Sequence, residues 1–347
     1  MSASRSIPHL ACAIILLGCI SLIPHAAVAD EAGDLASAIL SHLRERLPAT
    51  AGPVTSTDEA NVRVFARSIL DMSYYPAEPQ KLAAAANAAI DEADQKTATV
   101  SSLVRAALTA AFESVGHGSR VFPHHGTQAP AGDDAKPLPL PQARQVGPLW
   151  VVSLSAMMAP DSNTRGECIH DYGRYFDGFS KQTTRGIVLD LRGNEGGYLP
   201  DSACLASLFV GPGAELFQVV DKKGLNRAFK SESSGRDPLT LPLLIFIDRR
   251  TDSGGLLLAA TLQDQHRAKI IGETKSAING TVYSLLRPKI LDADVKFPMG
   301  ELMLPGNRPL TAGVRVDVTV PAQDEEALMN AARATLAPSS LTAAHGS

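Results

Sequence analysis

Short apolar runs that alternate with helix-like stretches dominate the chain after residue 148, and they limit the folds open to it. In chain order these runs are "LWVVSLS", "RGIVLDL", "PLLIFID" and "AKIIGE". The segments "DYGRYFDGFSKQ", "PDSACLASLFVG" and "GGLLLAATLQ" lie between them and have the spacing of helices. Strands that alternate with helices in this way predict an α/β fold with partly parallel strand pairing.

The chain before residue 122 has a different composition, rich in alanine, leucine and charged residues. "LASAILSHLRERL", "KLAAAANAAIDEADQ" and "SSLVRAALTAAFESV" have helical periodicity, so we predict a small helical domain over residues 30–122. Residues 123–147 are rich in proline and poor in apolar side chains, which indicates a linker or loop. The α/β core is then expected over residues 148–335, followed by a flexible tail at 336–347.

The first 29 residues have the layout of a secretory signal peptide. An apolar stretch runs from Leu10 to Ile23, and the small residues Ala27-Val28-Ala29 end the segment. The apolar stretch is shorter than the roughly 20 residues of a membrane-spanning helix, and the small residues favour cleavage before Asp30. We therefore expect an exported protein, periplasmic or secreted, with no membrane span after cleavage. A retained membrane anchor and lipoprotein processing at Cys19 are the alternatives.

Charge and histidine spacing argue against two classes of ligand. The formal net charge is −4 and no basic cluster is present, so nucleic acid is not an expected partner. His117, His124 and His125 form the pattern H-x6-H-H, which is not a recognised metal-ligand spacing. We expect neither a metal nor another cofactor.

Two cysteines, Cys168 and Cys204, remain once the predicted signal peptide is removed. In an oxidising compartment they are candidates for a single disulfide. The sequence does not decide whether they pair.

Ser253 stands at a predicted strand-to-helix turn, in "RRTDSGGLLLAATLQDQ". One interpretation is structural, because Ser and Asp are favoured at helix N-caps, where a side-chain oxygen accepts from free backbone N–H groups. The other is a nucleophile, because a helix start offers free N–H groups and a positive dipole end to a developing oxyanion. Gly254 and Gly255 would let a substrate carbonyl approach the backbone.

A second candidate element is "GIVLDLRGNEGG", residues 186–197, in which a buried strand ends in a glycine-rich loop. The loop lacks both G-x-G-x-x-G and a Walker lysine, so a nucleotide site is disfavoured. A backbone loop that binds an oxyanion or a peptide fits better. Asp190 and Arg192 are also explained by a structural ion pair.

Together these motifs resemble the C-terminal-processing, or tail-specific, serine peptidase family. The resemblance rests on "GIVLDLRGNEGG", "PLLIFIDRRTDSGGLLLAATLQDQHRAKIIGET" and "GNRPLTAGVRVDVTVP", in that order, over roughly residues 148–325. It implies a core similar to crotonase and Clp protease. By the same resemblance Ser253 is the nucleophile, and Gly254, Gly196 and Gly197 lie where the family has its backbone oxyanion donors.

The chain departs from the family pattern at several positions. Ile278 or Asn279 stands where many members have a lysine base, and Lys275 lies a few residues earlier as an alternative base. Leu256 replaces the glutamate that follows the nucleophile in the family. Residues 120–147 leave no room for the PDZ module that many members carry.

A PDZ-less branch with an N-terminal helical domain resembles the chain more closely. "AAFESVGHGSRVFP" matches its L-G-D-G-H-S-R motif and places His117 at the position of a general base. An imidazole suits this role because its pKa of about 6.5 lies near working pH. The orienting acid is not apparent, since Val115, Leu310 and Thr311 occupy the neighbourhoods where related enzymes have one.

The resemblance therefore predicts an exported serine endopeptidase with Ser253 as nucleophile, His117 as general base and a backbone oxyanion hole. Its substrates would be peptides or unfolded proteins bound as extended strands. The alternative is a catalytically inactive member of the family that binds peptides or another ligand.

Overall fold

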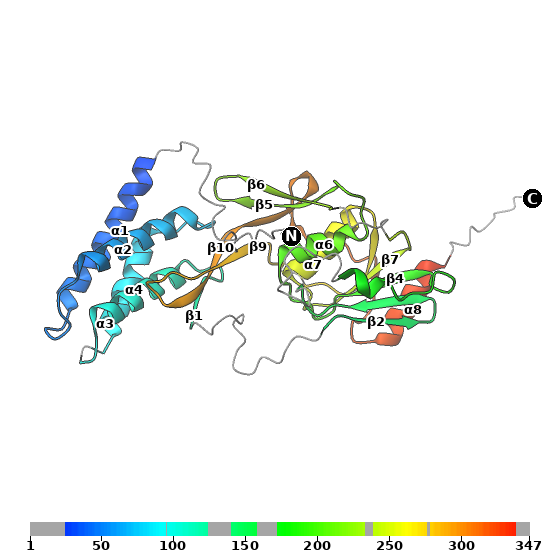
Figure 1. The fold of residues 1–347 in the computed structure, drawn as a ribbon, viewed down its shortest axis with the longest axis horizontal. Coiled ribbons are helices and arrows are strands. Elements are labelled where there is room, and N and C mark those ends of the chain that lie inside the picture. Colours follow the sequence, from blue (N-terminus) through cyan, green and yellow to red (C-terminus); the bar gives the residue numbers. More distant parts are fainter. Residues whose placement is uncertain are drawn as a thin grey trace, which may run out of the picture. The chain divides into compact units, whose positions relative to one another are not determined.

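The computed structural model describes two compact units. A helical unit takes in the chain up to Val121 together with Pro288–Asp292, and an α/β unit takes in Phe122–Arg287 and the chain from Ala293 (Figure 1). The described residues are 25–94, 96–123, 140–157, 172–232, 239–275 and 278–337.

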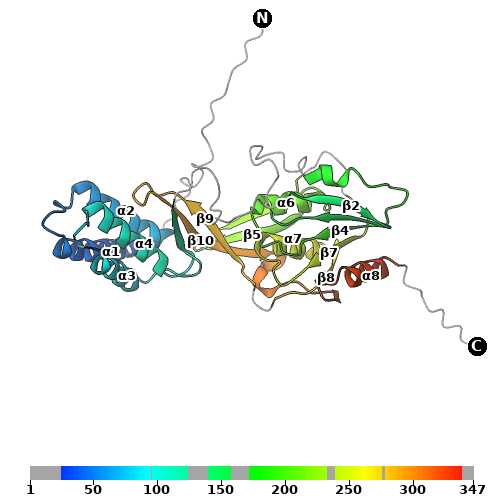
Figure 2. The same ribbon diagram turned by 90° about the horizontal axis from the view of Figure 1, so that it is seen from below.

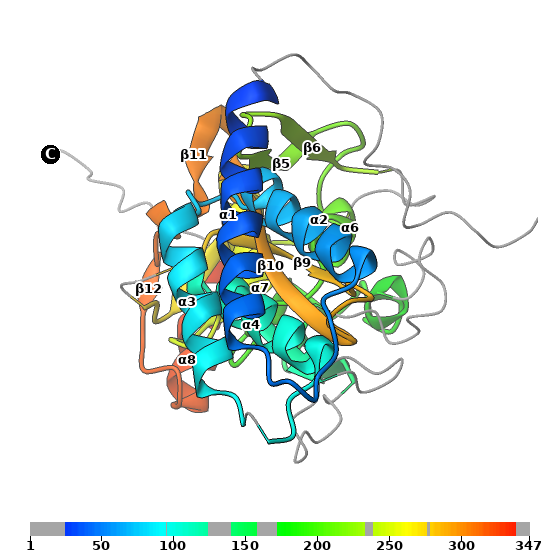
Figure 3. The ribbon, with the colours of Figure 1, turned by 90° about the vertical axis from the view of Figure 1, so that its left-hand side faces the viewer.

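Four helices with apolar faces form the described part of the helical unit (Figure 3). Capping boxes begin two of them, since the side chains of Thr55 and Thr99 accept from Asp58 N and Ser102 N. The first helix starts at His25, before the predicted cleavage position. The helices are α1 (His25–Arg46), α2 (Ser56–Met72), α3 (Pro79–Glu92) and α4 (Val100–Ser114).

A six-stranded sheet with the order β12-β8-β7-β4-β3-β2 is the centre of the α/β unit. All neighbouring pairs are parallel except β2 and β3. The strands are β2 (Gln142–Val146), β3 (Leu149–Ser153), β4 (Gly186–Asp190), β7 (Leu243–Ile247), β8 (Ala268–Gly272) and β12 (Val318–Thr319).

Helices cover both faces of this sheet (Figure 2). Ile187 and Leu189 of β4 pack with α6 (Leu199–Ser207) and α7 (Ser253–Asp264). Val188 points the other way and packs with α8 (Glu325–Leu336). Burial on two faces explains why these strands are continuous apolar runs rather than alternating patterns.

A second six-stranded sheet has the order β1-β10-β5-β6, and β9 and β11 also pair with β10. Strand β10 is antiparallel to β5, β9 and β11, and β5 is antiparallel to β6. The strands are β1 (Arg120–Pro123), β5 (Glu215–Asp221), β6 (Asn226–Lys230), β9 (Thr281–Leu286), β10 (Ala293–Leu304) and β11 (Arg308–Pro309).

The structure confirms an α/β core preceded by a helical unit, and it corrects two local predictions. In the described part of the predicted helix "DYGRYFDGFSKQ", Tyr172 and Gly173 are helical and the 3-10 turn η1 (Arg174–Phe176) follows, so the helix ends earlier than predicted. Gly178 lies so close to the indole of Trp150 that an added Cβ would be 3.0 Å away. The predicted linker 123–147 contains strand β2, an edge strand with little apolar surface that backbone pairing to β3 holds.

Two further observations bear on the location and chemistry of the chain. Among the described residues no helix is long and apolar enough to cross a membrane. Cys204 is disulfide-bonded, and Cys168, the candidate partner from the sequence, lies outside the described residues.

Candidate active site

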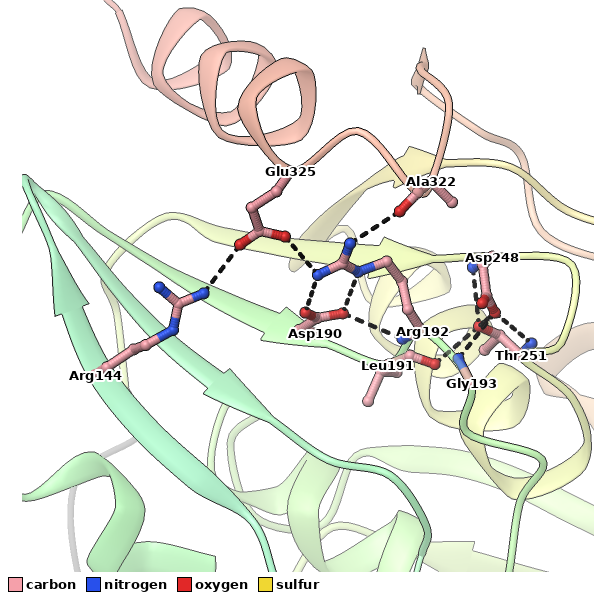
Figure 4. A network of polar contacts seen from close by, with 9 residues as sticks. All are labelled: Arg144, Asp190, Leu191, Arg192, Gly193, Asp248, Thr251, Ala322 and Glu325. Atoms are coloured by element: carbon pink, nitrogen blue, oxygen red, sulfur yellow. Dashed lines mark hydrogen bonds and ion pairs between the residues drawn. The ribbon is translucent and has the colours of Figure 1, made fainter. Parts of the chain in front are cut away.

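The turn between β7 and α7 is tied to the loop that follows β4. Asp248 Oδ1 accepts hydrogen bonds from the backbone N–H groups of Gly193, Arg250 and Thr251 at 2.9–3.0 Å (Figure 4). The hydroxyl of Thr251 donates to the carbonyl of Leu191 at 2.8 Å. These bonds fix the position of the chain just before Ser253.

Arg192 holds the first part of the same loop through an ion-pair network (Figure 4). Its Nη2 lies 2.6 Å from Asp190 Oδ2 and 2.7 Å from Glu325 Oε2, and its Nη1 donates to the carbonyl of Ala322. Arg144 donates to the other oxygen of Glu325 at 2.9 Å. The network connects the loop to α8, which gives Asp190 and Arg192 a structural role.

The charges in this network shift two pKa values in directions that favour the ionised forms. The hydrogen bond to Asp190 raises the pKa of Arg192 well above its ordinary value, although burial opposes the shift. Burial would raise the pKa of Glu325, but hydrogen bonds and charge attraction from Arg192 and Arg144 outweigh burial and lower it.

Asn194 is the buried centre of the contact between the loop and α7. Its Nδ2 donates to Leu154 O, its Oδ1 accepts from Gly196 N, and its carbonyl accepts from Asp252 N at 2.9 Å. A Cβ at Gly255 would lie 2.8 Å from Asn194 Oδ1, so only glycine fits there. This structural role of Asn194 did not emerge from the sequence.

Ser253 begins α7 but does not cap it. The N-cap is Asp252, with extended φ and ψ of −148° and 173°, and its side chain makes no capping bond. The cap interpretation of Ser253 is therefore wrong. Ser253 itself has a φ of +47°, a conformation that is strained for a residue with a Cβ, and such strain concentrates at functional sites.

Gly196 and Gly197 lie in the loop next to the start of α7, where Gly254 follows Ser253. A Cβ at Gly196 would lie 2.6 Å from Ser253 Cβ and 3.0 Å from its Oγ, and the φ of Gly196 is +112°. A Cβ at Gly197 would lie 2.1 Å from the carbonyl oxygen of Met157. Gly196 is therefore required for the close approach of the loop to Ser253, and Gly197 for the close approach of the loop to Met157.

Two backbone donors beside Ser253 are left without an acceptor. Within the described residues, the N–H groups of Gly197 and Gly254 make no hydrogen bond, and neither does Ser253 Oγ. The two N–H groups are close neighbours, since a Cβ at Gly254 would lie 3.4 Å from Gly197 N. Unpaired donors next to a hydroxyl are the arrangement that stabilises an oxyanion.

Lys275 lies at the same site, paired with the residue before the serine. Its Nζ donates to Asp252 Oδ2 at 2.5 Å, and the two side chains are 30% and 19% exposed. Asp252 Oδ1 is buried and has no hydrogen-bond partner among the described residues. A pocket of about 430 Å³ opens here, lined by Glu195, Arg250, Asp252, Ser253, Lys275, Asn279, Tyr283 and Lys296.

His117 lies in the helical unit, in the loop after α4. Its exposed imidazole stacks on the ring of Tyr75, with centroids 3.7 Å apart and planes 11° apart. Its φ is +50°, and the flanking Gly116 and Gly118 also have positive φ. This contact between Tyr75 and His117 was not predicted from the sequence. The structure thus brings Ser253, Lys275 and the glycines together in one unit and places His117 in the other.

The positions at which the chain departs from the family pattern have ordinary structural roles. Leu256 and Leu310 are fully buried in the core of the α/β unit, and Asn279 lines the pocket. The described residues include no cluster of three or more His, Cys, Asp or Glu side chains that would hold a metal.

A family comparison matches the part of the chain that carries this site. Residues 157–320 match the sequence profile described as Peptidase family S41. The stretch includes the glycine loop, Ser253 and Lys275, and it leaves out the helical unit with His117.

Curated relatives match the chain over a short stretch. The carboxy-terminal processing protease CtpA of Bacillus subtilis is 32% identical over 98 residues, which are 28% of this chain and 21% of that protein. The chloroplastic C-terminal processing peptidase of Tetradesmus obliquus is 35% identical over 98 residues, 28% of this chain and 21% of that protein. The chain thus spans about a fifth of the length of these two relatives.

Solved structures extend the likeness of the fold to most of the chain. A lipoprotein from Streptococcus agalactiae has a TM-score of 0.60 at 16% identity, over 81% of this chain and 96% of that one. A protein from Parabacteroides merdae has a TM-score of 0.52 at 16% identity, over 82% of this chain and 98% of that one. At these identities the likeness concerns the fold alone.

Proposed function

We propose that the chain is an exported serine endopeptidase that hydrolyses peptide bonds through Ser253. One observation carries the proposal: Ser253, held at a φ of +47°, lies beside the N–H groups of Gly197 and Gly254, which have no acceptor within the described residues. Similarity to the S41 family over residues 157–320 supports the same chemistry.

In the proposed reaction, Ser253 Oγ attacks the carbonyl carbon of the scissile bond and loses its proton to a general base. The carbonyl oxygen becomes an oxyanion, to which Gly197 and Gly254 donate. Collapse of this intermediate breaks the C–N bond, and the departing amine takes the proton from the base. Water then hydrolyses the acyl-enzyme by the same steps and restores the serine. No cofactor is required for these steps.

His117 and Lys275 are the two candidates for the base. His117 is proposed from its place in the family motif, and its stacking on Tyr75 holds the imidazole in one orientation. Lys275 lines the pocket with Ser253, but it donates to Asp252, and a lysine accepts a proton only in its neutral form. We therefore propose His117 as the base and assign Lys275 an electrostatic role next to Asp252.

Export from the cytoplasm is the second part of the proposal. The apolar N-terminal stretch and the small residues before Asp30 support cleavage of a signal peptide and a periplasmic or secreted location. The disulfide at Cys204 is compatible with an oxidising compartment.

A non-catalytic peptide-binding protein is the second candidate function. The observation that favours it is that Ser253 Oγ has no hydrogen-bond acceptor among the described residues, because an unassisted hydroxyl is a poor nucleophile. The same pocket and glycine loop would then hold a peptide without cleaving it.

Hydrolysis of an unfolded protein by the purified chain tests the proposal. We expect wild type to produce fragments that mass spectrometry detects, Ser253→Ala to produce none, and His117→Ala to lose at least about 100-fold in kcat/KM. Lys275→Ala is the matched comparison, and a larger loss there than in His117→Ala would transfer the role of base to Lys275. A folded wild type that binds the protein without cutting it would favour the second function.

A further inference from the structure

We infer that Ser202 is a positioning residue that sets where the two backbone donors for the oxyanion lie. Its hydroxyl donates to the carbonyl oxygen of Gly254 at 3.0 Å. Gly254 carries one of the two N–H groups beside Ser253 that have no acceptor within the described residues, and Gly197 carries the other. The inference rests on the proposed function, since it concerns the groups that would stabilise the intermediate of that reaction.

The two donors lie at the starts of two different helices, α6 and α7 (Figure 2). Gly197 comes directly before Tyr198, the N-cap residue of α6, and Gly254 is the second residue of α7. One oxyanion can accept from both N–H groups only if the two helix starts keep a fixed separation. A hydrogen bond that joins α6 to α7 close to these residues therefore sets the geometry of the oxyanion site.

Ser202 makes such a bond from the first turns of α6. A Cβ at Gly254 would lie 3.1 Å from Ser202 Oγ and 3.4 Å from Gly197 N, so the hydroxyl and the N–H group contact the same side of Gly254. The backbone N–H of Tyr198 donates to the carbonyl of Met157 at 2.8 Å, which fixes the start of α6. The hydroxyl of Ser202 thus holds Gly254 close to Gly197.

Asn194 holds the start of α7 from the other end of the glycine loop. Its carbonyl accepts from Asp252 N at 2.9 Å. Gly197 therefore lies, along the chain, between one residue that binds the start of α7 and a second one, Ser202, that does the same. Loss of the second bond would leave the loop attached to α7, but the separation of the two donors would be less well defined.

The hydroxyl of Ser202 is buried, which makes its bond to Gly254 more than a surface contact. Ser202 is 1% exposed, and the apolar residues of α6 and α7 belong to one core cluster. A buried hydroxyl without a partner is unfavourable, and the bond to Gly254 removes that cost. A carbonyl oxygen has two lone pairs, so Gly254 O can accept from Ser202 in addition to a helical N–H group. Ser202→Ala therefore removes the link between the helices and leaves the helical bonding of α7 in place.

The kinetics of Ser202→Ala test the inference. The oxyanion forms only during the reaction, so a displaced donor lowers kcat and leaves substrate binding unchanged. With a fluorogenic peptide built on a bond that wild type cleaves, we expect kcat to fall about tenfold, less than for loss of a whole donor. KM should stay within about twofold of the wild-type value. Labelling of Ser253 by a fluorophosphonate, whose phosphoryl oxygen occupies the oxyanion site, should also be about tenfold slower.

Ser207→Ala is the matched control. Ser207 is also a buried serine of α6, 2% exposed, but its hydroxyl donates to Ala203 O at 2.8 Å and accepts from Glu232 N at 3.1 Å, neither of which belongs to α7. Each variant removes one buried hydroxyl from the same helix, so urea titrations should give similar losses of unfolding free energy. We expect Ser207→Ala to retain the wild-type kcat and labelling rate.

The outcomes separate the inference from the proposed function. Wild-type kcat and labelling rate in Ser202→Ala, or equal losses in Ser202→Ala and Ser207→Ala, would overturn the inference and leave the proposed function intact. A wild type that is labelled at Ser253 but cuts no protein would overturn the proposed function. Labelling that is slower in Ser202→Ala than in Ser207→Ala would then still support the inference, and equal labelling rates would overturn it.

Discussion

The two halves of the loop after β4 differ in how their polar groups are satisfied. In the first half, Asp190 and Arg192 are paired with each other, with α8 and with backbone carbonyl groups (Figure 4). In the second half, the N–H group of Gly197 has no acceptor within the described residues. The same holds for the N–H group of Gly254, which belongs to the first turn of α7. The paired groups of the first half hold the loop in place, whereas the two donors without an acceptor lie beside Ser253 and can bind a substrate oxygen.

Among substitutions in the loop after β4, Gly196→Ala is expected to have the largest effect on activity. In Gly196→Ala the new Cβ would lie 2.6 Å from Ser253 Cβ, at a φ of +112° that a residue with a side chain rarely adopts. We expect kcat/KM to fall by more than about 100-fold, because misplacement of reacting groups by about 1 Å has costs of that size. Steady-state peptide hydrolysis measures it.

Gly193→Ala is the matched control for that substitution. Gly193 has a similar positive φ of +73°, but a Cβ there would meet nothing within 4 Å. The variant should lose about 1 kcal/mol of unfolding free energy to backbone strain and retain its activity. Equal losses of activity in both variants would show that loop strain in general, rather than contact with Ser253, explains the effect.

Arg192→Met, in contrast to Gly196→Ala, should act on the stability of the fold. The variant leaves Asp190, which is 8% exposed, without its ion-pair partner, and we expect a loss of about 2–3 kcal/mol in unfolding free energy by urea titration. Arg144→Met, at a side chain that is 54% exposed, should cost less than about 0.5 kcal/mol. Equal unfolding free energies for wild type and both variants would show that the ion-pair network does not stabilise the fold.

The smallest predicted effect is on the pH dependence of stability. The pKa of Glu325 is lowered in the folded state, so its stabilisation is present above the ordinary value of 4.5 and is lost as pH falls through the folded pKa. Because this carboxylate is 46% exposed, Glu325→Gln should cost less than about 1 kcal/mol at neutral pH. Urea titrations of the two proteins should converge in strongly acidic buffer, and a gap that widened there would contradict the assignment.

The sequence predicted the parallel core well because its strands are buried on both faces. β3, β4, β7 and β8 are continuous apolar runs, and the structure confirms each of them. β9 and β10 escaped prediction because β10 mixes polar and apolar residues and contains Pro298 and Gly300, which indicate a break in sequence. The register shift between these two residues accommodates them within the strand.

The candidate site was predictable in its backbone and less so in its charges. The glycines near Ser253 were predicted from sequence motifs, because positions where backbone segments approach closely require glycine. The pairing of Lys275 with Asp252, and the place of Lys296 in the pocket, depend on segments brought together by the fold. The positive φ of Ser253 likewise results from tertiary contacts and has no sequence signature.

Covalent labelling with a fluorophosphonate tests the central claim most directly, because the serine oxygen displaces fluoride only where the site activates it. We expect the folded wild-type chain to gain one adduct, located by peptide mass spectrometry on Ser253. Ser253→Ala should gain none at the same unfolding free energy. A folded wild type that remains unlabelled across a pH series, or equal labelling of Ser253→Ala, would contradict the account.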